Sequence, residues 1–227
     1  AATFSLMLTG EVLERPELHH KKMERTLRGA MNRLGEPVIR NATWQAMRIL
    51  GGQFVFGRNM TEALKRAAPE RDRGLTHSFD MLGEAAMTFA DADRYRKAYI
   101  DAIERLKSES DGTLTGSPGI SVKLTALYPK YDIFHGEKAV TALVPIVNDL
   151  ARRARDANIH FTIDAEEADR LELSLDVIDR VFTDPSLSDW DGFGLAIQAY
   201  QKRAPEVIEH IGELCRATGE RMMVRLV

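Results

Sequence analysis

The chain has 227 residues, of which 44% are apolar and 29% are charged, and its net charge is −3 at neutral pH. That apolar content can bury a sizeable core, which excludes wholesale disorder, and the near-neutral charge excludes the global basic field that nucleic-acid-binding proteins carry. The single cysteine, Cys215, excludes a disulfide framework and a cysteine-based zinc site. No apolar run reaches the roughly 18 residues of a membrane span, and the amino-terminal patch lacks the basic start of a signal peptide, so we expect a cytoplasmic protein.

The first part of the chain, residues 1–70, is predicted to be a helical segment. Apolar residues recur at helical spacing over 16–34, 41–50 and 61–67. Glycines at 51 and 52 are expected to end the second helix, and Pro69 is expected to close the third. We therefore assign residues 1–70 to a helical arm that precedes the main domain.

From residue 71 onward, short apolar strands alternate with longer helical stretches. The predicted strands cover 76–82, 119–127, 159–165, 192–199 and 222–227. Helices are predicted from Asp91 to about residue 107 and over 137–157, 167–182 and 205–218. Repeated strand–helix units predict a parallel sheet.

Each predicted strand has one large aliphatic face and one small or polar face. A polar group lies toward the carboxyl end of every strand, and the five are Asp80, Lys123, Asp164, Gln198 and Arg225. A doubly wound sheet is covered on both faces and would be apolar throughout, whereas a barrel has its active site at the carboxyl ends of its strands. Any one of these groups alone could have a structural role instead, as a polar residue that pairs with a neighbouring residue where the barrel closes. All five together favour a ligand site, because buried charges are costly unless they pair or bind something.

The fold class is therefore α/β, with a (β/α)8 TIM-type barrel as the architecture. A complete barrel of this type needs about 250 residues. Residues 71–227 supply only the first five β/α units, and the sequence stops within the apolar run MMVRLV. We expect the chain to be the front part of a larger domain.

Several long ungapped runs resemble one known family. The runs are DMLGEAA (80–86), GISVKLTALYPKY (119–131), IDAEEADRLELSLD (163–176), IQAYQKRAP (197–205) and VRLV (224–227). They are similar to the proline dehydrogenase domain of the bacterial bifunctional proline-utilization flavoenzymes of the PutA type. Residues 34–57 resemble the helical segment that precedes that barrel.

The resemblance implies an FAD-dependent oxidation of L-proline to 1-pyrroline-5-carboxylate, the first step of proline catabolism. Electrons would pass to a quinone at the membrane surface, which places the parent protein at the periphery of the inner membrane. Its further partners would be the rest of the barrel and an aldehyde dehydrogenase domain that acts on 1-pyrroline-5-carboxylate. No amino-terminal DNA-binding segment or nucleic-acid contact is evident, and the six histidines have no metal-ligand spacing, so no metal is expected.

The resemblance also implies roles for individual residues. Lys123 would contact the substrate carboxylate, with Asp164 beside the substrate and linked to that lysine. Arg225 would lie near the flavin N5, which makes Lys123, Asp164 and Arg225 the candidate catalytic residues. The remaining assignments are Ala165, Gln198 and Val227 against the cofactor, together with Asp164 and Arg225, and Glu84 as a gate that pairs with a late arginine.

Two other interpretations stay open from the residues alone. Lys123 could form a Schiff base, as in a class I aldolase, although the nearby Asp164 should favour its charged form. Borohydride trapping with a carbonyl substrate would distinguish this reaction. The chain could instead be a non-catalytic fragment or scaffold, because an open sheet exposes an edge and an apolar face. The family resemblance implies that the chain holds about half of the flavin site, so we expect this polypeptide alone to bind FAD weakly or not at all.

Overall fold

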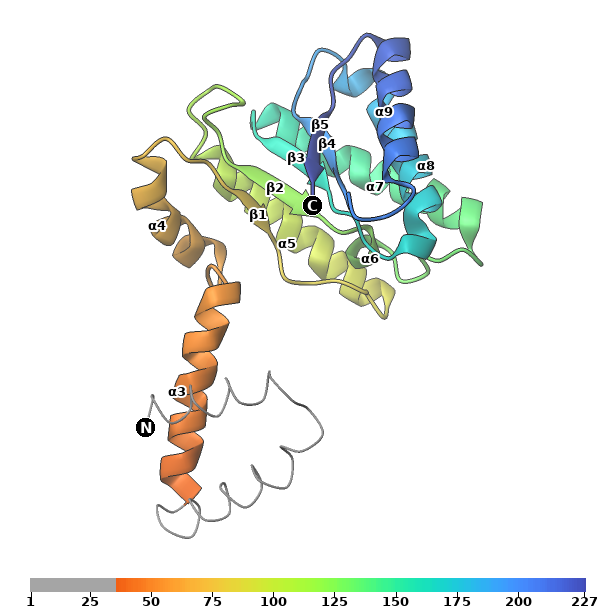
Figure 1. The fold of residues 1–227 in the computed structure, drawn as a ribbon. Coiled ribbons are helices and arrows are strands. Elements are labelled where there is room, and N and C mark those ends of the chain that lie inside the picture. The colour runs from red at the N-terminus through yellow and green to blue at the C-terminus, as the bar shows by residue number, and fades with distance from the viewer. Residues whose placement is uncertain (1–35) are drawn as a thin grey trace. The chain divides into compact units, whose positions relative to one another are not determined.

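The computed structural model describes residues 36–227, and the chain divides into two compact units, residues 1–66 and 67–227. In the first unit, helix α3 runs over Glu36–Phe54 (Figure 1). Helix α4, Met60–Arg71, crosses the division between the units. The helix predicted over 16–34 lies outside the described residues. The functional boundary at residues 70 and 71 stays a prediction.

Two predicted helix ends in this region are wrong. Helix α3 continues through Gly51 and Gly52 to Phe54, because a helical glycine costs only about 1 kcal/mol relative to alanine. Helix α4 contains Pro69 and continues to Arg71. Near the end of a helix, a proline removes a single backbone hydrogen bond, so the last turn can form around it.

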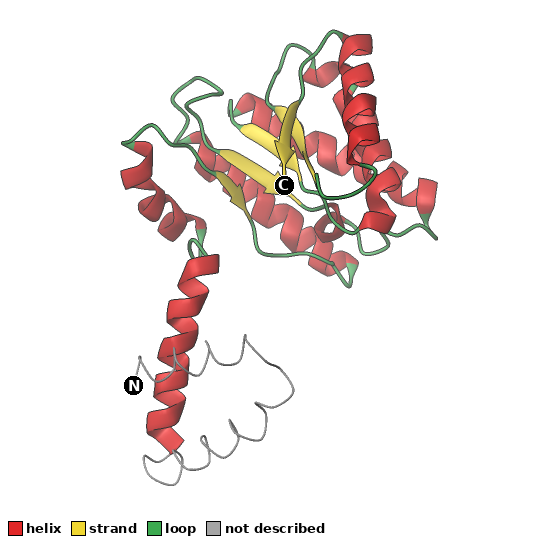
Figure 2. Cartoon of the chain, in the orientation of Figure 1, coloured by secondary structure: helices red, strands yellow, loops and turns green. Residues whose placement is uncertain are grey.

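The second unit is a five-stranded parallel sheet in the order β1-β2-β3-β4-β5 (Figure 2). The strands are β1 Ser78–Asp80, β2 Gly119–Val122, β3 His160–Ile163, β4 Phe193–Ile197 and β5 Met223–Leu226. The helices between them are α5 Phe89–Lys107, α7 Gly136–Asp156, α8 Leu171–Phe182, which follows a 3-10 turn at Ala168–Arg170, and α9 Ala204–Thr218. The predicted alternation of strands and helices and the parallel sheet are confirmed.

The strand register separates the two predicted faces of the sheet. Phe79 pairs with Ile120, and Ile120 with Phe161, so large apolar residues lie in one row. These three side chains and that of Phe193 are buried in the core with helices α5, α7 and α8. The opposite face carries the adjacent row Asp80, Ser121, Thr162, Gly194 and Met223. We call this second surface the inner face.

The second strand is shorter than predicted. Strand β2 ends at Val122, and Leu124–Leu127 form a one-turn helix, α6, where the sequence pattern predicts continued strand. Leu124 and Thr125 are both buried, so the alternation of faces stops at Lys123. The backbone N–H of Thr125 donates to a carboxylate oxygen of Glu166 at 3.1 Å. That contact satisfies a donor that the start of a helix leaves without an intrahelical partner.

Within residues 36–227, no helix is both long and apolar enough to cross a membrane. The same residues contain no group of three or more histidine, cysteine or acidic side chains placed to hold a metal ion.

Candidate active site

The carboxyl ends of the parallel strands bring four charged side chains to one edge of the sheet. Asp164 follows β3 directly. Its backbone N–H donates to the backbone carbonyl of Val122, so the hydrogen-bonded pairing of β2 with β3 extends to the position of Lys123. On the other side, Ala196 of β4 pairs with Arg225 of β5. Asp80 ends β1. Four of the five predicted strand-end groups therefore meet on the inner face.

These four side chains form an alternating network, which we call the charge cluster. Lys123 Nζ donates to Asp80 Oδ2 at 2.6 Å and to Asp164 Oδ2 at 2.9 Å. The second carboxylate oxygen of Asp164 accepts from Arg225. The side chain of Asp164 is 10% exposed and that of Lys123 is 17% exposed, whereas Arg225 at 43% and Asp80 at 45% border the solvent. Asp164 is thus the buried centre of the cluster.

The surroundings of Lys123 keep its ammonium group charged. Burial lowers the pKa of Lys123, but the hydrogen bonds and charges of Asp80 and Asp164 outweigh burial and raise the pKa above its usual value. A nucleophilic Schiff-base lysine needs the opposite, a lowered pKa. The environment of Lys123 therefore disfavours the aldolase-like interpretation and favours a cationic anchor.

The side chain of Tyr99, from helix α5, contacts the backbone of the same lysine. Its hydroxyl accepts the backbone N–H of Lys123 at 3.2 Å, and the residue is 1% exposed. Burial raises the pKa of Tyr99 to about 12, so the phenol is neutral at physiological pH. The backbone donor at the junction of β2 and α6 is thereby satisfied.

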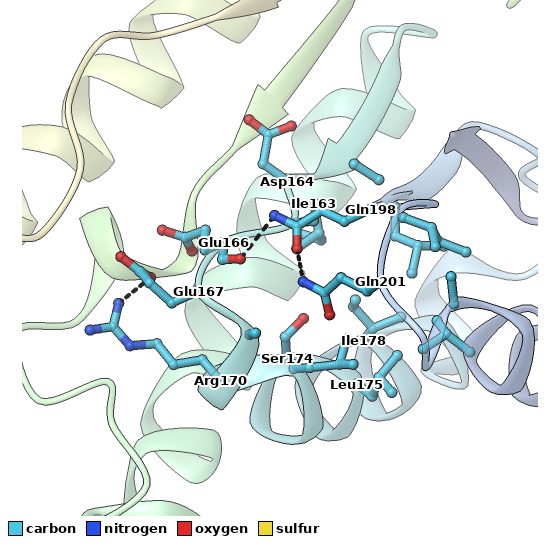
Figure 3. A pocket seen from close by; sticks show the side chains of 18 of the residues that line it. Ile163, Asp164, Glu166, Glu167, Arg170, Ser174, Leu175, Ile178, Gln198 and Gln201 are labelled. Atoms are coloured by element: carbon cyan, nitrogen blue, oxygen red, sulfur yellow. Dashed lines mark hydrogen bonds and ion pairs between the residues drawn. The ribbon is translucent and has the colours of Figure 1, made fainter. Parts of the chain in front are cut away.

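Gln198 is not part of the charge cluster, and Figure 3 shows its side chain between Glu166 and Gln201. Its Nε2 donates to the main-chain oxygen of Glu166 at 3.1 Å, and its Oε1 accepts from Gln201. These residues border a cavity of about 30 Å³ that also reaches Ser174 and Arg170. A space of that size holds about one water molecule, which is far too small for a cofactor.

Glu166 is a member of the site that the sequence analysis missed. Burial raises the pKa of its carboxyl group, and the hydrogen bonds from the hydroxyl and N–H of Thr125 act in the opposite direction. Glu166 therefore ties the loop after β3 to helix α6, which follows Lys123. The two adjacent glutamates in the run IDAEEADRLE could have drawn attention to Glu166, but nothing in the sequence identifies Thr125 as its partner.

The other predicted site residues do not join the cluster. Ala165 follows Asp164 and borders the cavity near Gln198. Val227 is 61% exposed, and its backbone pairs with Ile197 and Ala199, each at 2.9 Å. Glu84 is exposed in the loop after β1, and within the described part of the chain it forms no ion pair. The roles assigned to these residues stay predictions.

Two family models match the chain. The model described as proline dehydrogenase matches residues 63–227, and the model described as the DNA-binding domain of proline dehydrogenase matches residues 1–54. The second match contradicts the expectation that no amino-terminal DNA-binding segment is present. The whole-chain charge of −3 concealed this segment, because residues 1–54 hold eight Lys or Arg against five Asp or Glu.

Curated relatives match over the whole chain. The bifunctional protein PutA of Klebsiella aerogenes is 42% identical over 229 aligned residues, which cover 100% of this chain and 17% of that protein. PutA of Escherichia coli K12 is 41% identical with the same coverage. PutA of Rhizobium meliloti is 42% identical and is covered to 18%. The chain thus spans less than a fifth of the length of these relatives.

Solved structures support the same relationship. A crystal structure of proline utilization A from Bradyrhizobium japonicum has a TM-score of 0.73 and 52% identity, and the match covers 87% of this chain and 20% of that one. Proline utilization A from Bdellovibrio bacteriovorus, inactivated by N-propargylglycine, has a TM-score of 0.79 at 22% identity and covers 84% of this chain and 21% of that one. The second likeness concerns the fold alone, and together they confirm the partial barrel. With its family model matched over residues 63–227, the chain belongs to the proline dehydrogenase family.

Proposed function

We propose that this chain contributes the substrate side and part of the cofactor side of an FAD-dependent enzyme that oxidises L-proline to 1-pyrroline-5-carboxylate. The observation that carries the proposal is the charged Lys123 held between Asp80 and Asp164 at the carboxyl edge of the sheet. Barrel enzymes bind their substrates at that edge. Membership of the proline dehydrogenase family supports the identity of the substrate.

Lys123 is suited to bind the carboxylate of proline. An ammonium group has three N–H donors, and Asp80 and Asp164 accept two of them. The third donor remains for the substrate. Two cations, Lys123 and Arg225, face two carboxylates, so the charge cluster is neutral overall. A neutral site matches a zwitterionic amino acid, which carries one charge of each sign.

The donor set beside the cluster fits the edge of a flavin ring. The guanidinium of Arg225 has five N–H donors, which suit a ring nitrogen and oxygen that gain negative charge. Gln198 keeps one N–H and one lone pair beyond its contacts with Glu166 and Gln201. Ala165 is small and partly exposed, so it would not block a flat ring that lies outside the small cavity beside Gln198. Bound FAD would supply the acceptor for the hydride that leaves the Cδ–H bond of proline, since the C=N bond of 1-pyrroline-5-carboxylate forms between that carbon and the ring nitrogen.

The wider reaction is also part of the proposal. We assign the reoxidation step to a quinone at the inner membrane surface, within a cytoplasmic protein that also carries a 1-pyrroline-5-carboxylate dehydrogenase activity. Glu84 is proposed to gate the site, and Val227 is proposed to contact the cofactor.

The family match of residues 1–54 supports a second, DNA-binding role. A gel-shift titration of duplex DNA at rising salt concentration tests that role, and the absence of any salt-sensitive complex would refute it.

The proposed reaction is tested with the enzyme that contains this chain, purified with its flavin. Proline added without oxygen should bleach the flavin absorbance. Lys123→Met should weaken proline binding at least tenfold, because the carboxylate loses a charged hydrogen bond worth about 1.5–3 kcal/mol. Lys138→Met, at an exposed position of α7, is the matched control and should bind proline as the unsubstituted enzyme does.

Three outcomes would point away from proline oxidation. A parent protein that binds no flavin, or whose flavin proline does not reduce, contradicts the proposal. Borohydride trapping of a carbonyl substrate on Lys123 would establish the Schiff-base alternative instead. Self-association without flavin would favour the scaffold.

A further inference from the structure

Ser121 is a buried hydroxyl on the inner face that contacts a residue of the proposed site. It lies in β2 and is 1% exposed. Its Oγ is 2.9 Å from Nη1 of Arg225 and 3.0 Å from Oγ of Ser78. Ser121 and Arg225 are 104 positions apart in the sequence, and the two strands β3 and β4 lie between them in the sheet.

The chemistry of arginine settles the direction of one of these two hydrogen bonds. A guanidinium can only donate, so the oxygen of Ser121 accepts from Arg225. The hydrogen bond between Ser121 and Ser78 can run in either direction, because each hydroxyl can donate and accept. The buried hydroxyl of Ser121 thus has two hydrogen-bond partners, Arg225 and Ser78.

Strand β4, the neighbour of β5, bears on how Arg225 reaches so far. Gly194 of β4 lies on the inner face, and a Cβ at that position would be 2.4 Å from the carbonyl oxygen of Met223. Ala196 pairs with Arg225 directly and has only a methyl side chain. Gly194 therefore allows the close pairing of β4 with β5, and with only the methyl group of Ala196 opposite it the guanidinium of Arg225 reaches Asp164, which follows β3, and Ser121 on β2.

We propose that Ser121 is a positioning residue that fixes the plane of the Arg225 guanidinium, and this inference rests on the proposed function, in which Arg225 faces the flavin. Asp164 binds one terminal nitrogen and Ser121 binds the other. A planar guanidinium whose two terminal nitrogens are both hydrogen-bonded cannot rotate about its long axis. The donors that remain are thereby held in one direction before any ligand is bound, which is the condition for strong electrostatic stabilisation.

The test compares Ser121→Ala, Ser121→Cys and Ser78→Ala in the flavin-containing enzyme. The alanine removes the acceptor, and the cysteine keeps a side chain of similar volume with a weak acceptor. Both variants should bind FAD about tenfold more weakly and reduce it about tenfold more slowly, as the loss of one hydrogen bond to a charged group requires. Proline affinity should stay unchanged, because Lys123 keeps both of its carboxylates. Ser78→Ala keeps the acceptor for Arg225 and should behave as the parent does.

The measurements are FAD affinity from fluorescence quenching, the flavin midpoint potential, and the rate and proline dependence of flavin reduction. A more negative potential in both Ser121 variants supports the inference, since a loosely held cation stabilises the reduced flavin less. Parent-like potential and affinity in both variants overturn it. A parent-like potential with lowered thermal stability also overturns it, because Ser121 would then be structural only. If the unsubstituted enzyme neither binds FAD nor oxidises proline, the proposed function fails first, and the two failures remain distinct.

Discussion

The substitution Asp164→Asn removes the charge at the centre of the cluster with almost no change in shape. The carboxylate of Asp164 accepts from Lys123 at 2.9 Å and from Arg225, and it is 10% exposed. The amide would leave two cations with Asp80 as their only carboxylate in the cluster. Both the stability of the sheet edge and the orientation of Lys123 and Arg225 should suffer.

The size of the loss follows from the contacts. Two hydrogen bonds between charged groups are worth about 1.5–3 kcal/mol each, which gives roughly 3–6 kcal/mol if both are lost completely. Lys123 keeps Asp80, Arg225 keeps Ser121, and the Arg225 side chain is 43% exposed, so solvent and the remaining partners replace about half. We expect a loss of about 2–3 kcal/mol, which lowers Tm by about 4–12 °C in a unit of this size.

The assay is urea unfolding followed by circular dichroism, together with stopped-flow reduction of the flavin by proline. The rate constant divided by the proline dissociation constant should fall about a hundredfold, as expected when reacting groups lose their orientation. Asp149→Asn is the matched control, because this helical carboxylate pairs with Arg96 at 3.0 Å and Arg153 at 3.3 Å near the surface. Such surface pairs contribute at most about 1 kcal/mol. Equal stability and equal proline oxidation in the two variants would refute the central role of Asp164.

Two further predictions concern neighbours of the cluster. Asp80→Asn should weaken proline binding about fivefold, because the half-exposed pair with Lys123 contributes up to about 1 kcal/mol. It should also lower the pKa of Lys123, so that proline affinity, measured against pH, begins to fall at a lower alkaline pH than in the parent; an unchanged profile would show that Asp80 does not hold the lysine. Because burial raises the pKa of Glu166 in the folded state, its protonation stabilises the fold as pH falls from neutral toward the unfolded value near 4.5. The free energy of unfolding of the unsubstituted protein and of Glu166→Gln is measured with urea at several pH values. The unsubstituted protein should gain stability relative to the variant as pH falls, and a difference that stays constant with pH would contradict the raised pKa of Glu166.

The inner face could be predicted from the sequence because strand periodicity fixes it. Side chains alternate at a period of two, and parallel strands all end at one edge of the sheet. Those two rules are enough to place Asp80, Lys123, Asp164 and Arg225 near one another. The rules fail where the chain leaves the strand, as at Leu124, because a single helical turn of four residues has no periodicity to detect.

The partners of each group could not be predicted, because they depend on register. Ser121 meets Arg225 only because successive strands pair without a slip across the whole sheet. The Glu166–Thr125 contact joins the loop after β3 to helix α6, 41 positions apart in the sequence, and loop conformation leaves no pattern in a single sequence. The family resemblance supplied roles for Glu84 and Val227, but neither role depends on a contact within the described residues.

The charge balance of the cluster explains why a barrel interior can carry four ionised groups. An isolated buried charge is expensive, and a buried pair survives only when its remaining donors and acceptors are also satisfied. Asp164 meets this condition with one cation on each oxygen, and the β4 residue that pairs with Arg225, Ala196, has only a methyl side chain. A small residue at this position is therefore as necessary to the site as its charges. A bulky side chain in place of Ala196 would separate Arg225 from Asp164, and it would leave the buried carboxylate with Lys123 alone.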